Sequence, residues 1–357
     1  MDFEKTLKKY KDIIDSELKT LFDEKISDSR DFIKSSYSYL KEFVLRGGKR
    51  LRPVITIMAY KAVCDQDEAK IFLPAVGIEL FHNSSLIHDD IMDEDSKRRG
   101  MLSMHKYFDG LFLKDYPEKN YEGRIFRKMS ERFGVSLAIL QGDILYALTE
   151  NCFTHSPFSA AKIRKALDVV NRTYRMICEG QMLDILSELK RDSTENEYLQ
   201  TVEAKTAHLF KAAIQVGAIF GGATGRSLNA LSQYAVSIGT AFQLQDDLID
   251  IRPGLKGHAF GSDIRRGKYT LLMIKAFEIA NREQKRKLLS ALGNDKADRQ
   301  TMDAAVDVLV ATGAVDYVKR LAGHKIRQGR SCLMNAGLSE EACAFFEGLA
   351  DFIAVTI

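Results

Sequence analysis

The chain contains 357 residues, of which 45% are hydrophobic and 28% are charged. This composition is typical of globular proteins and excludes the disordered, collagen-like and disulfide-rich classes. The formal net charge is only +3, an excess too small to indicate nucleic-acid binding, so we expect no nucleic-acid partner. The cysteines are widely spaced and form no Cys-x-x-Cys pair, which favours reduced thiols in a cytoplasmic protein over a zinc site. They are Cys64, Cys152, Cys178, Cys332 and Cys343.

Helical periodicity begins with the first residues of the chain. Leu7, Tyr10, Ile14, Leu18 and Leu21 recur three or four residues apart, as on one face of an amphipathic helix. This charged segment lacks the apolar stretch of a signal peptide. No later apolar run approaches the ~20 residues that span a bilayer, so we expect no membrane span.

The scarcity of proline and the absence of alternating strand patterns favour an all-α fold. No linker or low-complexity tract divides the chain, and we therefore expect a single domain over residues 1–357. The predicted helices span residues 2–24, 28–46, 52–64, 69–93, 122–151, 159–190, 195–221, 227–252, 269–291, 301–313, 315–335 and 339–355.

Two connections between predicted helices are unusually long. The first covers residues 94–121, and the second, which is rich in glycine and charge, covers residues 252–268. Connections of this length in a compact domain are usually functional, and the glycines suit a loop that closes over a ligand.

An Asp-Asp-x-x-Asp cluster precedes each of these connections. The clusters are Asp89, Asp90 and Asp93, and Asp246, Asp247 and Asp250. A spacing of four residues places the outer carboxylates on one face of a helix, where they can share a cation. A single cluster often arises by chance as an exposed acidic face, but two in matching context are much rarer.

The chemistry of these carboxylates indicates a metal. Carboxylates on apolar helices repel one another and raise one another's pKa unless a cation compensates them. Oxygen ligands without His or Cys favour Mg²⁺, which bridges readily to phosphate oxygens. The two clusters therefore indicate a diphosphate substrate.

Basic residues accompany the acidic clusters. Residues 47–53 combine two glycines, which allow close backbone approach, with Lys49, Arg50 and Arg52, whose side chains suit phosphate oxygens. Arg98 and Arg99 follow the first cluster closely enough to reach a metal-bound diphosphate. Each basic group alone is more often a solvated turn, but together with the Asp clusters they indicate diphosphate chemistry.

In order and spacing these motifs resemble the trans-isoprenyl diphosphate synthase (polyprenyl synthetase) family. The resemblance covers about residues 45–275 and is carried by Gly47–Pro53, His82–Gly100, Gly180-Gln181-x-x-Asp184, Lys205-Thr206, Phe242–Asp250 and Gly261–Leu271. It implies a single-domain helical bundle of the isoprenoid synthase type around a deep central cavity. It also implies that the Asp clusters face each other across the mouth of that cavity, and that the protein is a homodimer.

The resemblance implies a role for each matching residue. The metal-binding residues would be Asp89, Asp90, Asp93, Asp246, Asp247 and Asp250, holding about three Mg²⁺ ions with the diphosphate. Isopentenyl diphosphate would contact Lys49, Arg52, His82 and Arg99, the allylic diphosphate would contact Arg98, and Lys268 would be a further diphosphate contact. The catalytic set would be Asp89, Asp93, Asp246, Lys205, Thr206 and Gln243, with Asp184 near the metals.

The implied reaction is a Mg²⁺-dependent head-to-tail condensation of isopentenyl diphosphate with an allylic diphosphate. The allylic C–O bond breaks to a resonance-stabilised cation, the isopentenyl double bond attacks, and a proton is lost to the departing diphosphate. We expect His88 to pack between helices or support the cluster from behind, and not to bind metal. Where family members carry a lysine in the late loop, this chain has His258, with Lys256 nearby.

The product length depends on residues before the first cluster. Ser85, Ser84 and Phe81 lie four, five and eight residues before Asp89, and helical geometry points them down the cavity. Family members that stop at fifteen carbons tend to carry aromatic residues at the first two positions. The serines therefore predict geranylgeranyl diphosphate, with about twenty carbons, and Ser84→Phe should shorten it. Phe81, or bulk within residues 133–148, would form the floor.

Other functions fit part of the pattern. A C15 farnesyl or a C25 and longer synthase would share every motif. A class I terpene cyclase would also ionise an allylic diphosphate, but it needs no second basic pocket and normally carries a different second metal motif. A non-catalytic partner subunit would be expected to have lost acidic residues. A helical carrier of hydrophobic ligands would leave the carboxylates unexplained.

Overall fold

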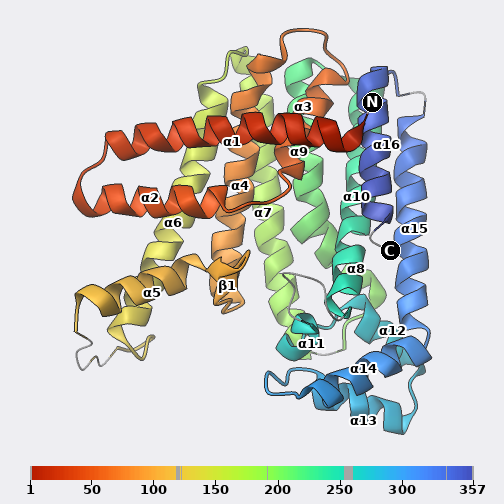
Figure 1. The fold of residues 1–357 in the computed structure, drawn as a ribbon. Helices are drawn as coiled ribbons and strands as arrows, with labels where there is room; N and C mark the ends of the chain where they lie inside the picture. The colour runs from red at the N-terminus through yellow and green to blue at the C-terminus, as the bar shows by residue number, and fades with distance from the viewer. Residues whose placement is uncertain are drawn as a thin grey trace. The chain divides into compact units, whose positions relative to one another are not determined.

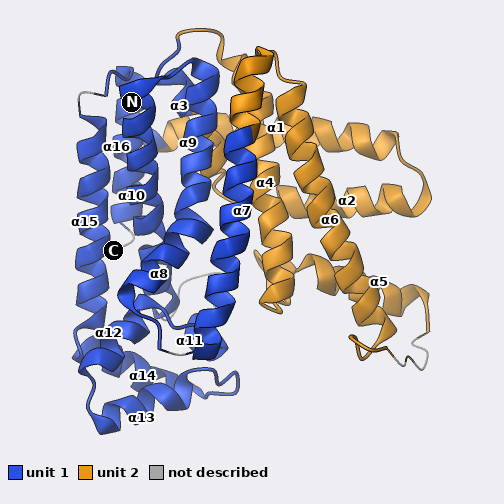
Figure 2. Cartoon of the chain, turned by 180° about the vertical axis from the view of Figure 1, so that it is seen from behind, with its two compact units in different colours: residues 1–3, 58–64, 168–357 blue, residues 4–57, 65–167 orange. Residues whose placement is uncertain are grey.

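The computed structural model describes residues 2–117, 121, 123–190, 192–252, 260–334 and 336–355. Its chain forms two compact units, shown in Figure 2: unit 1 comprises residues 1–3, 58–64 and 168–357, and unit 2 comprises residues 4–57 and 65–167. Compactness alone does not say whether such units fold independently. The single-domain organisation therefore stays a prediction.

The described residues are predominantly helical (Figure 1), which confirms the predicted all-α class. Extended structure in these ranges is confined to a small hairpin of strands β1 (Lys97–Arg98) and β2 (Met101–Leu102). The strands are antiparallel, with Lys97 opposite Leu102 and Arg98 opposite Met101. None of the helices in the described ranges combines the length and apolar composition that crossing a membrane requires.

Unit 2 is built around helix α4, which is apolar on nearly every side and packs along α6. Thr149 of α6 donates a hydrogen bond from its hydroxyl to the Gly77 carbonyl of α4, at 3.2 Å. Helix α5 packs on α6 as well. The helical elements of this unit are α1 (Phe3–Ser27), α2 (Asp31–Leu45), most of α3 (Leu51–Lys61), the 3₁₀ turn Glu68–Ile71, α4 (Phe72–Met92), α5 (Met104–Asp115) and α6 (Met129–Thr154).

Unit 1 is centred on helix α10, which packs against α9 and α15. Its helical elements are most of α7 (Ala160–Lys190), α8 (Glu195–Val202), the π-helical turn η2 (Glu203–Ala207), α9 (His208–Gly221), α10 (Gly225–Asp250), α11 (Ser262–Arg266), α12 (Leu271–Ile279), α13 (Arg282–Ala291), α14 (Arg299–Ala311), α15 (Ala314–Leu333) and α16 (Glu340–Ala354).

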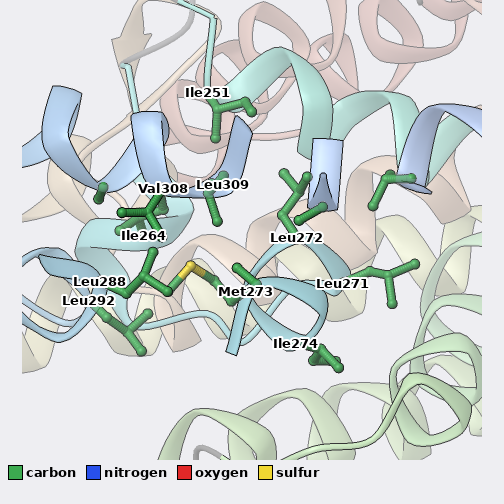
Figure 3. Close-up of a cluster of buried hydrophobic side chains, with 14 of the residues drawn as sticks. Ile251, Ile264, Leu271, Leu272, Met273, Ile274, Leu288, Leu292, Val308 and Leu309 are labelled. Carbon is green, nitrogen blue, oxygen red and sulfur yellow. The ribbon is translucent and has the colours of Figure 1, made fainter. Parts of the chain in front are cut away.

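A buried cluster of apolar side chains holds the end of α10 in place (Figure 3). Ile251, directly after α10, and Ile264 of α11 are buried in it together with side chains of α12, α13 and α14. Burial of such side chains stabilises a protein by about 1.5–3 kcal/mol each. The segment that carries the second Asp cluster is thus attached to a rigid apolar core.

Four features of the predicted helix layout were wrong. The helix predicted to begin at residue 122 begins at Met129. The predicted connection 94–121 contains the β1–β2 hairpin and helix α5, whose buried face consists of Met104, His105 and Phe108. The connection 252–268 contains α11. The predicted helix 269–291 is two helices, because Asn281 and Gln284 form a capping box that begins α13 anew.

Because α5 and α6 approach closely, replacing glycine by alanine should have opposite effects on stability at two positions. A Cβ at Gly134 would lie 2.4 Å from the His105 carbonyl oxygen, whereas a Cβ at Gly110 would meet nothing within 4 Å. Gly134→Ala should therefore lower the free energy of unfolding by about 1–3 kcal/mol. Gly110→Ala should raise it by up to about 1 kcal/mol through helix propensity. Urea unfolding measures both changes, and equal effects would contradict the packing.

Candidate active site

The first Asp cluster lies at the carboxyl end of α4, where the hairpin brings Arg98 against it. The side chain of Asp90 is fully buried, and its Oδ1 accepts hydrogen bonds from Nε of Arg98, at 2.7 Å, and from Nη2. Burial raises the pKa of Asp90 to about 6, although Arg98 opposes the shift. Asp90 Oδ2 has no hydrogen-bond partner among the described residues. Arg98 thus lies against this cluster, and its contact with a diphosphate stays a prediction.

The outer residues of this cluster, Asp89 and Asp93, are partly exposed. They lie one helical turn apart, with the Asp93 amide donating to the Asp89 carbonyl at 2.8 Å. The Arg98 guanidinium reaches within 3.9 Å of the Asp89 carboxylate. These two carboxylates can therefore bind an ion from solvent without displacing Arg98 from Asp90.

His88 has the packing role that its position predicted. Its Nε2 lies 3.2 Å from the Ile139 carbonyl and 3.6 Å from the Asp143 carboxylate, both on α6. A Cβ on Gly142 would lie 2.2 Å from the same nitrogen. His88 is thus packed closely against α6.

A group of cationic and imidazole side chains lies in the same unit. Arg52 Nη1 and His82 Nε2 are 3.1 Å apart. Arg99 Nη1 donates to the Gly47 carbonyl at 3.2 Å, and Lys49 is exposed between Gly48 and Arg50. Burial, reinforced by Arg52, lowers the pKa of His82, so its imidazole is neutral and can both donate and accept hydrogen bonds.

Arg50 departs from its expected role as a phosphate-binding side chain. Its guanidinium is fully buried, 2.6 Å from Glu79 and 2.7 Å from Asp15. With its donors used inside the protein, Arg50 cannot contact a diphosphate in this conformation.

The second Asp cluster, at the end of α10, combines one exposed and two buried carboxylates. Asp246 is exposed. Asp247 accepts hydrogen bonds from the Tyr198 hydroxyl and, at 3.1 Å, from Gln243 Nε2. Burial, with Asp263 and Asp246 adding negative charge, raises the pKa of Asp247 to about 8. Asp247 is therefore protonated near neutral pH unless a cation offsets its charge.

Asp250 caps the short helix α11. Its carboxylate accepts hydrogen bonds from the Ser262 amide at 2.9 Å and the Asp263 amide at 3.2 Å, as well as from the Ser262 hydroxyl. Burial and the charge of Asp263 raise the pKa of Asp250. Asp250 thus fixes the end of the late loop, where the chain enters α11. Lys256 and His258, the candidates for its diphosphate contact, lie outside the described residues.

A π-helical turn presents Lys205 and Thr206. Lys205 Nζ donates to Asp184 at 2.8 Å, and the Thr206 hydroxyl donates to Gln243 at 2.9 Å. A Cβ at Gly180 would approach the Lys205 amide nitrogen to 2.8 Å, so this glycine leaves room for the wider turn. Isolated π-turns occur frequently at functional sites, and this one aims two polar side chains toward Asp184 and α10.

Lys268 and Asp184 complete this polar group in unit 1. Lys268 Nζ lies 4.0 Å from the Asp263 carboxylate. Burial alone would raise the pKa of Asp184, but Lys205 and Lys268 outweigh it and lower that pKa. The structure thus gathers Lys205, Thr206, Gln243, Lys268 and the second cluster in one unit.

Each predicted group is therefore present, but no three acidic, His or Cys side chains already converge as metal ligands anywhere in the described ranges. The contacts give the reason: Asp90 is engaged by Arg98, Asp247 by Tyr198 and Asp250 by the α11 amides. The six metal-binding assignments stay predictions.

Comparison with known proteins identifies the family. Residues 33–309 match the family model described as polyprenyl synthetase. The chain belongs to the polyprenyl synthetase family. It is accordingly a trans-prenyltransferase of the isoprenyl diphosphate synthase type, as the motifs predicted.

Individual relatives cover nearly the whole chain. A geranylgeranyl diphosphate synthase from Methanosarcina mazei is 38% identical over 83% of this chain and 82% of that protein. A short chain isoprenyl diphosphate synthase from Methanothermobacter thermautotrophicus is 32% identical over 97% and 96%. A crystal structure of geranylgeranyl pyrophosphate synthase from Corynebacterium glutamicum, complexed with isoprenyl diphosphate and magnesium, matches at a TM-score of 0.88, with 26% identity over 100% of both chains.

From the sequence, no role was assigned to two further residues of this polyprenyl synthetase that affect the second cluster. Tyr198 holds Asp247 from a neighbouring helix, and Asp263 raises the pKa of both Asp247 and Asp250. Asp263 stands in the conspicuous late loop and could have been found there. Tyr198 carries no motif signal, because only the packing of α8 near α10 brings it to the site.

The raised pKa of Asp247 predicts a pH-dependent stability of the metal-free protein. An unfolded Asp has a pKa of about 3.9, so between about pH 4 and the folded value of about 8 the folded state binds more protons. Stability should then fall as pH rises, by up to about 1.4 kcal/mol per pH unit from this group. Asp247→Asn should flatten the decline in melting temperature between pH 5 and 8 in a chelator. The exposed Asp303→Asn should keep the wild-type slope, and parallel profiles for all three proteins would contradict the assignment.

Proposed function

We propose that this enzyme condenses isopentenyl diphosphate head to tail with an allylic diphosphate, with Mg²⁺, and that its main product is geranylgeranyl diphosphate. The observation that carries the proposal is the pairing, within unit 2, of the carboxylates Asp89 and Asp93 with a separate basic group formed around Arg52, His82 and Arg99. An enzyme that only ionises a diphosphate needs the carboxylates but not the separate basic group. The basic group is explained if the enzyme also binds a second diphosphate.

The donor set fits Mg²⁺. Both clusters offer only oxygen ligands, which Mg²⁺ prefers. Asp247 is buried with a strongly raised pKa, as expected for a carboxylate that lacks a compensating cation. Asp90 is paired with Arg98 through one oxygen, and its other oxygen has no hydrogen-bond partner among the described residues. When bound, Mg²⁺ would neutralise charge on the leaving diphosphate. The proposed ligands are Asp89, Asp90, Asp93, Asp246, Asp247 and Asp250, with about three ions; Asp89, Asp93 and Asp246 reach solvent most easily.

The remaining polar residues divide between the two substrates. Lys49, Arg52, His82 and Arg99 would bind isopentenyl diphosphate through charge-assisted hydrogen bonds. Arg98 and Lys268 would bind the allylic diphosphate. Lys205, Thr206 and Gln243 would surround the carbon that ionises, held by their bonds to Asp184 and Asp247.

The protein groups act by position and charge and form no covalent intermediate. Arg98 and Lys268 stabilise the negative charge that develops as the allylic C–O bond breaks. The Thr206 and Gln243 dipoles face the cation that forms. The isopentenyl double bond then forms the new C–C bond, and the proton released from the adjacent carbon passes to the departing diphosphate. The fixed basic group keeps that double bond within reach.

A homodimer and a cytoplasmic location belong to the same proposal. The dimer follows from the family resemblance, and the location agrees with the widely spaced cysteines, which are free thiols in the structure. Light scattering coupled to size-exclusion chromatography would measure the mass in solution, and a monomer across micromolar concentrations would contradict the dimer.

The reaction is tested by incubating the purified protein with Mg²⁺, isopentenyl diphosphate and each of the C5, C10 and C15 allylic primers. Mass spectrometry of the products should show elongation up to C20. Formation of hydrocarbons without consumption of isopentenyl diphosphate would instead indicate a cyclase. Absence of elongation with every primer would refute the proposed function.

Loss of a metal-binding carboxylate should abolish turnover without unfolding the protein. Asp89→Ala and Asp246→Ala should each lower kcat by about 10³-fold or more, because charge on the leaving diphosphate is no longer compensated. Both positions are partly or fully exposed, so the melting temperature should stay close to that of the wild type. Asp168→Ala, an exposed change on α7, is the control with normal kcat. Near-normal kcat in either cluster variant would remove that residue from the metal site.

Chain length should depend most directly on Ser85. Ser84 is fully buried, and its hydroxyl donates to the Gly142 carbonyl of α6 at 2.8 Å, so Phe at 84 would also press on α6. Ser85 is partly exposed and bonds only within α4 among the contacts described, to the His82 carbonyl at 2.8 Å. Phe81 lies deeper, packed edge to face on Tyr146.

Ser85→Phe should therefore shift the product from C20 toward C15, because the aromatic ring occupies space that a growing chain needs. Product distributions by mass spectrometry measure the shift. Ser85→Ala, which keeps the side chain small, should leave the distribution unchanged. An unaltered C20 product from the Phe variant would show that α4 does not limit chain length at this position.

A further inference from the structure

The loop that carries Lys49 has an unusual backbone. Gly47 and Gly48 have φ values of +67° and +101°, and Arg50 has a φ of +51°. A left-handed conformation is common for glycine but uncommon for a residue with a long side chain. Something must hold Arg50 in this conformation, and the interactions of its guanidinium identify what does.

The Arg50 guanidinium uses its three nitrogens on three different elements. Nε donates to Asp15 of α1 at 2.7 Å, Nη1 to Glu79 of α4 at 2.6 Å, and Nη2 to the Val44 carbonyl of α2 at 2.7 Å. No part of the side chain is exposed. Planar donors in a rigid fork suit such simultaneous contacts, which an ammonium group could not reproduce.

Glu79, which pairs with Arg50, connects Arg50 to the part of α4 that lies near His82. Glu79 accepts a second hydrogen bond from Asn83 Nδ2 at 3.0 Å, and it lies three residues before His82. Arg52, two residues after Arg50, contacts His82 at 3.1 Å. The direction of the Arg50 side chain into the core thus determines where Arg52 leaves the loop.

The outer side of the loop is held by a different arginine. Arg99 donates to the Gly47 carbonyl at 3.2 Å, and a Cβ at Gly48 would lie 3.2 Å from the Arg99 guanidinium. The segment from Gly47 to Arg52 is therefore held from inside by Arg50 and from outside by Arg99. Lys49 is the basic residue of this turn that remains exposed.

We infer that Arg50 is a positioning residue for isopentenyl diphosphate: through Asp15 and Glu79 it holds the turn that presents Lys49 and Arg52 to the diphosphate, without touching the substrate itself. The inference rests on the proposed function. It assigns different roles to two neighbouring basic residues: Lys49 contacts the substrate, whereas Arg50 holds the turn from inside the protein. Loss of the anchor should weaken binding of isopentenyl diphosphate selectively, because the first Asp cluster is fixed by α4 and the hairpin.

The test measures KM for both substrates, and kcat, in Arg50→Met and Arg50→Lys. Small displacements of binding groups cost up to about 100-fold, so kcat/KM for isopentenyl diphosphate should fall about 10- to 100-fold in both variants. KM for the allylic primer should change less than about twofold. A direct phosphate contact predicts instead that Lys largely retains the affinity, and that result would overturn the inference.

Stability and positioning are separated by a double variant. Arg50→Met combined with Glu79→Met replaces a buried ion pair by apolar side chains of similar size, which is often tolerated by the fold. It should recover the melting temperature but not the KM for isopentenyl diphosphate. If the single Met variant does not fold, this double variant and Glu79→Gln carry the test. Recovery of a normal KM in a stable double variant would refute positioning.

Lys61→Met is the matched control, because it removes a partly buried ion pair with Glu341, at 2.8 Å, within unit 1. It should lower the melting temperature without changing either KM. The wild-type enzyme in the same assay shows whether the proposed function fails or only the inference about Arg50. If the wild type elongates primers and the Arg50 variants keep their KM, only the inference fails; if the wild type elongates nothing, the proposed function fails and the inference with it.

Discussion

A buried carboxylate must be compensated, because removing its charge from water costs several kcal/mol, and the two units achieve this differently. In unit 2, Asp90 is paired with the guanidinium of Arg98, which ties the β1–β2 hairpin to α4. In unit 1, the described hydrogen-bond donors to Asp247 and Asp250 are neutral hydroxyl and amide groups. Asp247 retains its proton as a result. The second cluster is therefore the one whose charge a bound cation would change most.

Irregular backbone positions many of the proposed site residues. A π-helical turn positions Lys205 and Thr206, and the hairpin of the short strands β1 and β2 positions Arg98. The left-handed backbone at Arg50 shapes the turn that carries Lys49. Such conformations persist only where surrounding contacts hold them. Here the contacts are specific: Asp184 holds Lys205, Asp90 holds Arg98, and Asp15 with Glu79 holds Arg50. Regular helices supply the frame, and ion pairs at their ends orient the proposed site residues.

Much of the fold followed from periodicity. Most long helices were predicted within a few residues, since an apolar stripe repeats every three or four positions along them, but α6 begins at Met129, seven residues later than predicted. The two connections were interpreted as loops, and the second was noted as rich in glycine and charge, yet α5 and α11 lie there. Helix α5 is stabilised by Met104 and Phe108 against α6, and α11 by the Asp250 cap. Stabilisation of this kind comes from partners distant in sequence, so local composition does not report it.

Order and spacing along the chain are linear properties, so the motifs were enough to identify the family and the reaction class and to predict which acidic and basic residues form the site. The chemistry of the residues alone did not distinguish Lys49 from Arg50, although the family resemblance assigned the substrate contact to Lys49. Neither did it distinguish Asp89 from Asp90, which are neighbours of like chemistry. The folded chain shows that Lys49 and Asp89 reach solvent while Arg50 and Asp90 are buried in ion pairs. This difference arises because burial and pairing depend on side chains, such as Glu79 and Arg98, that are brought close only by folding.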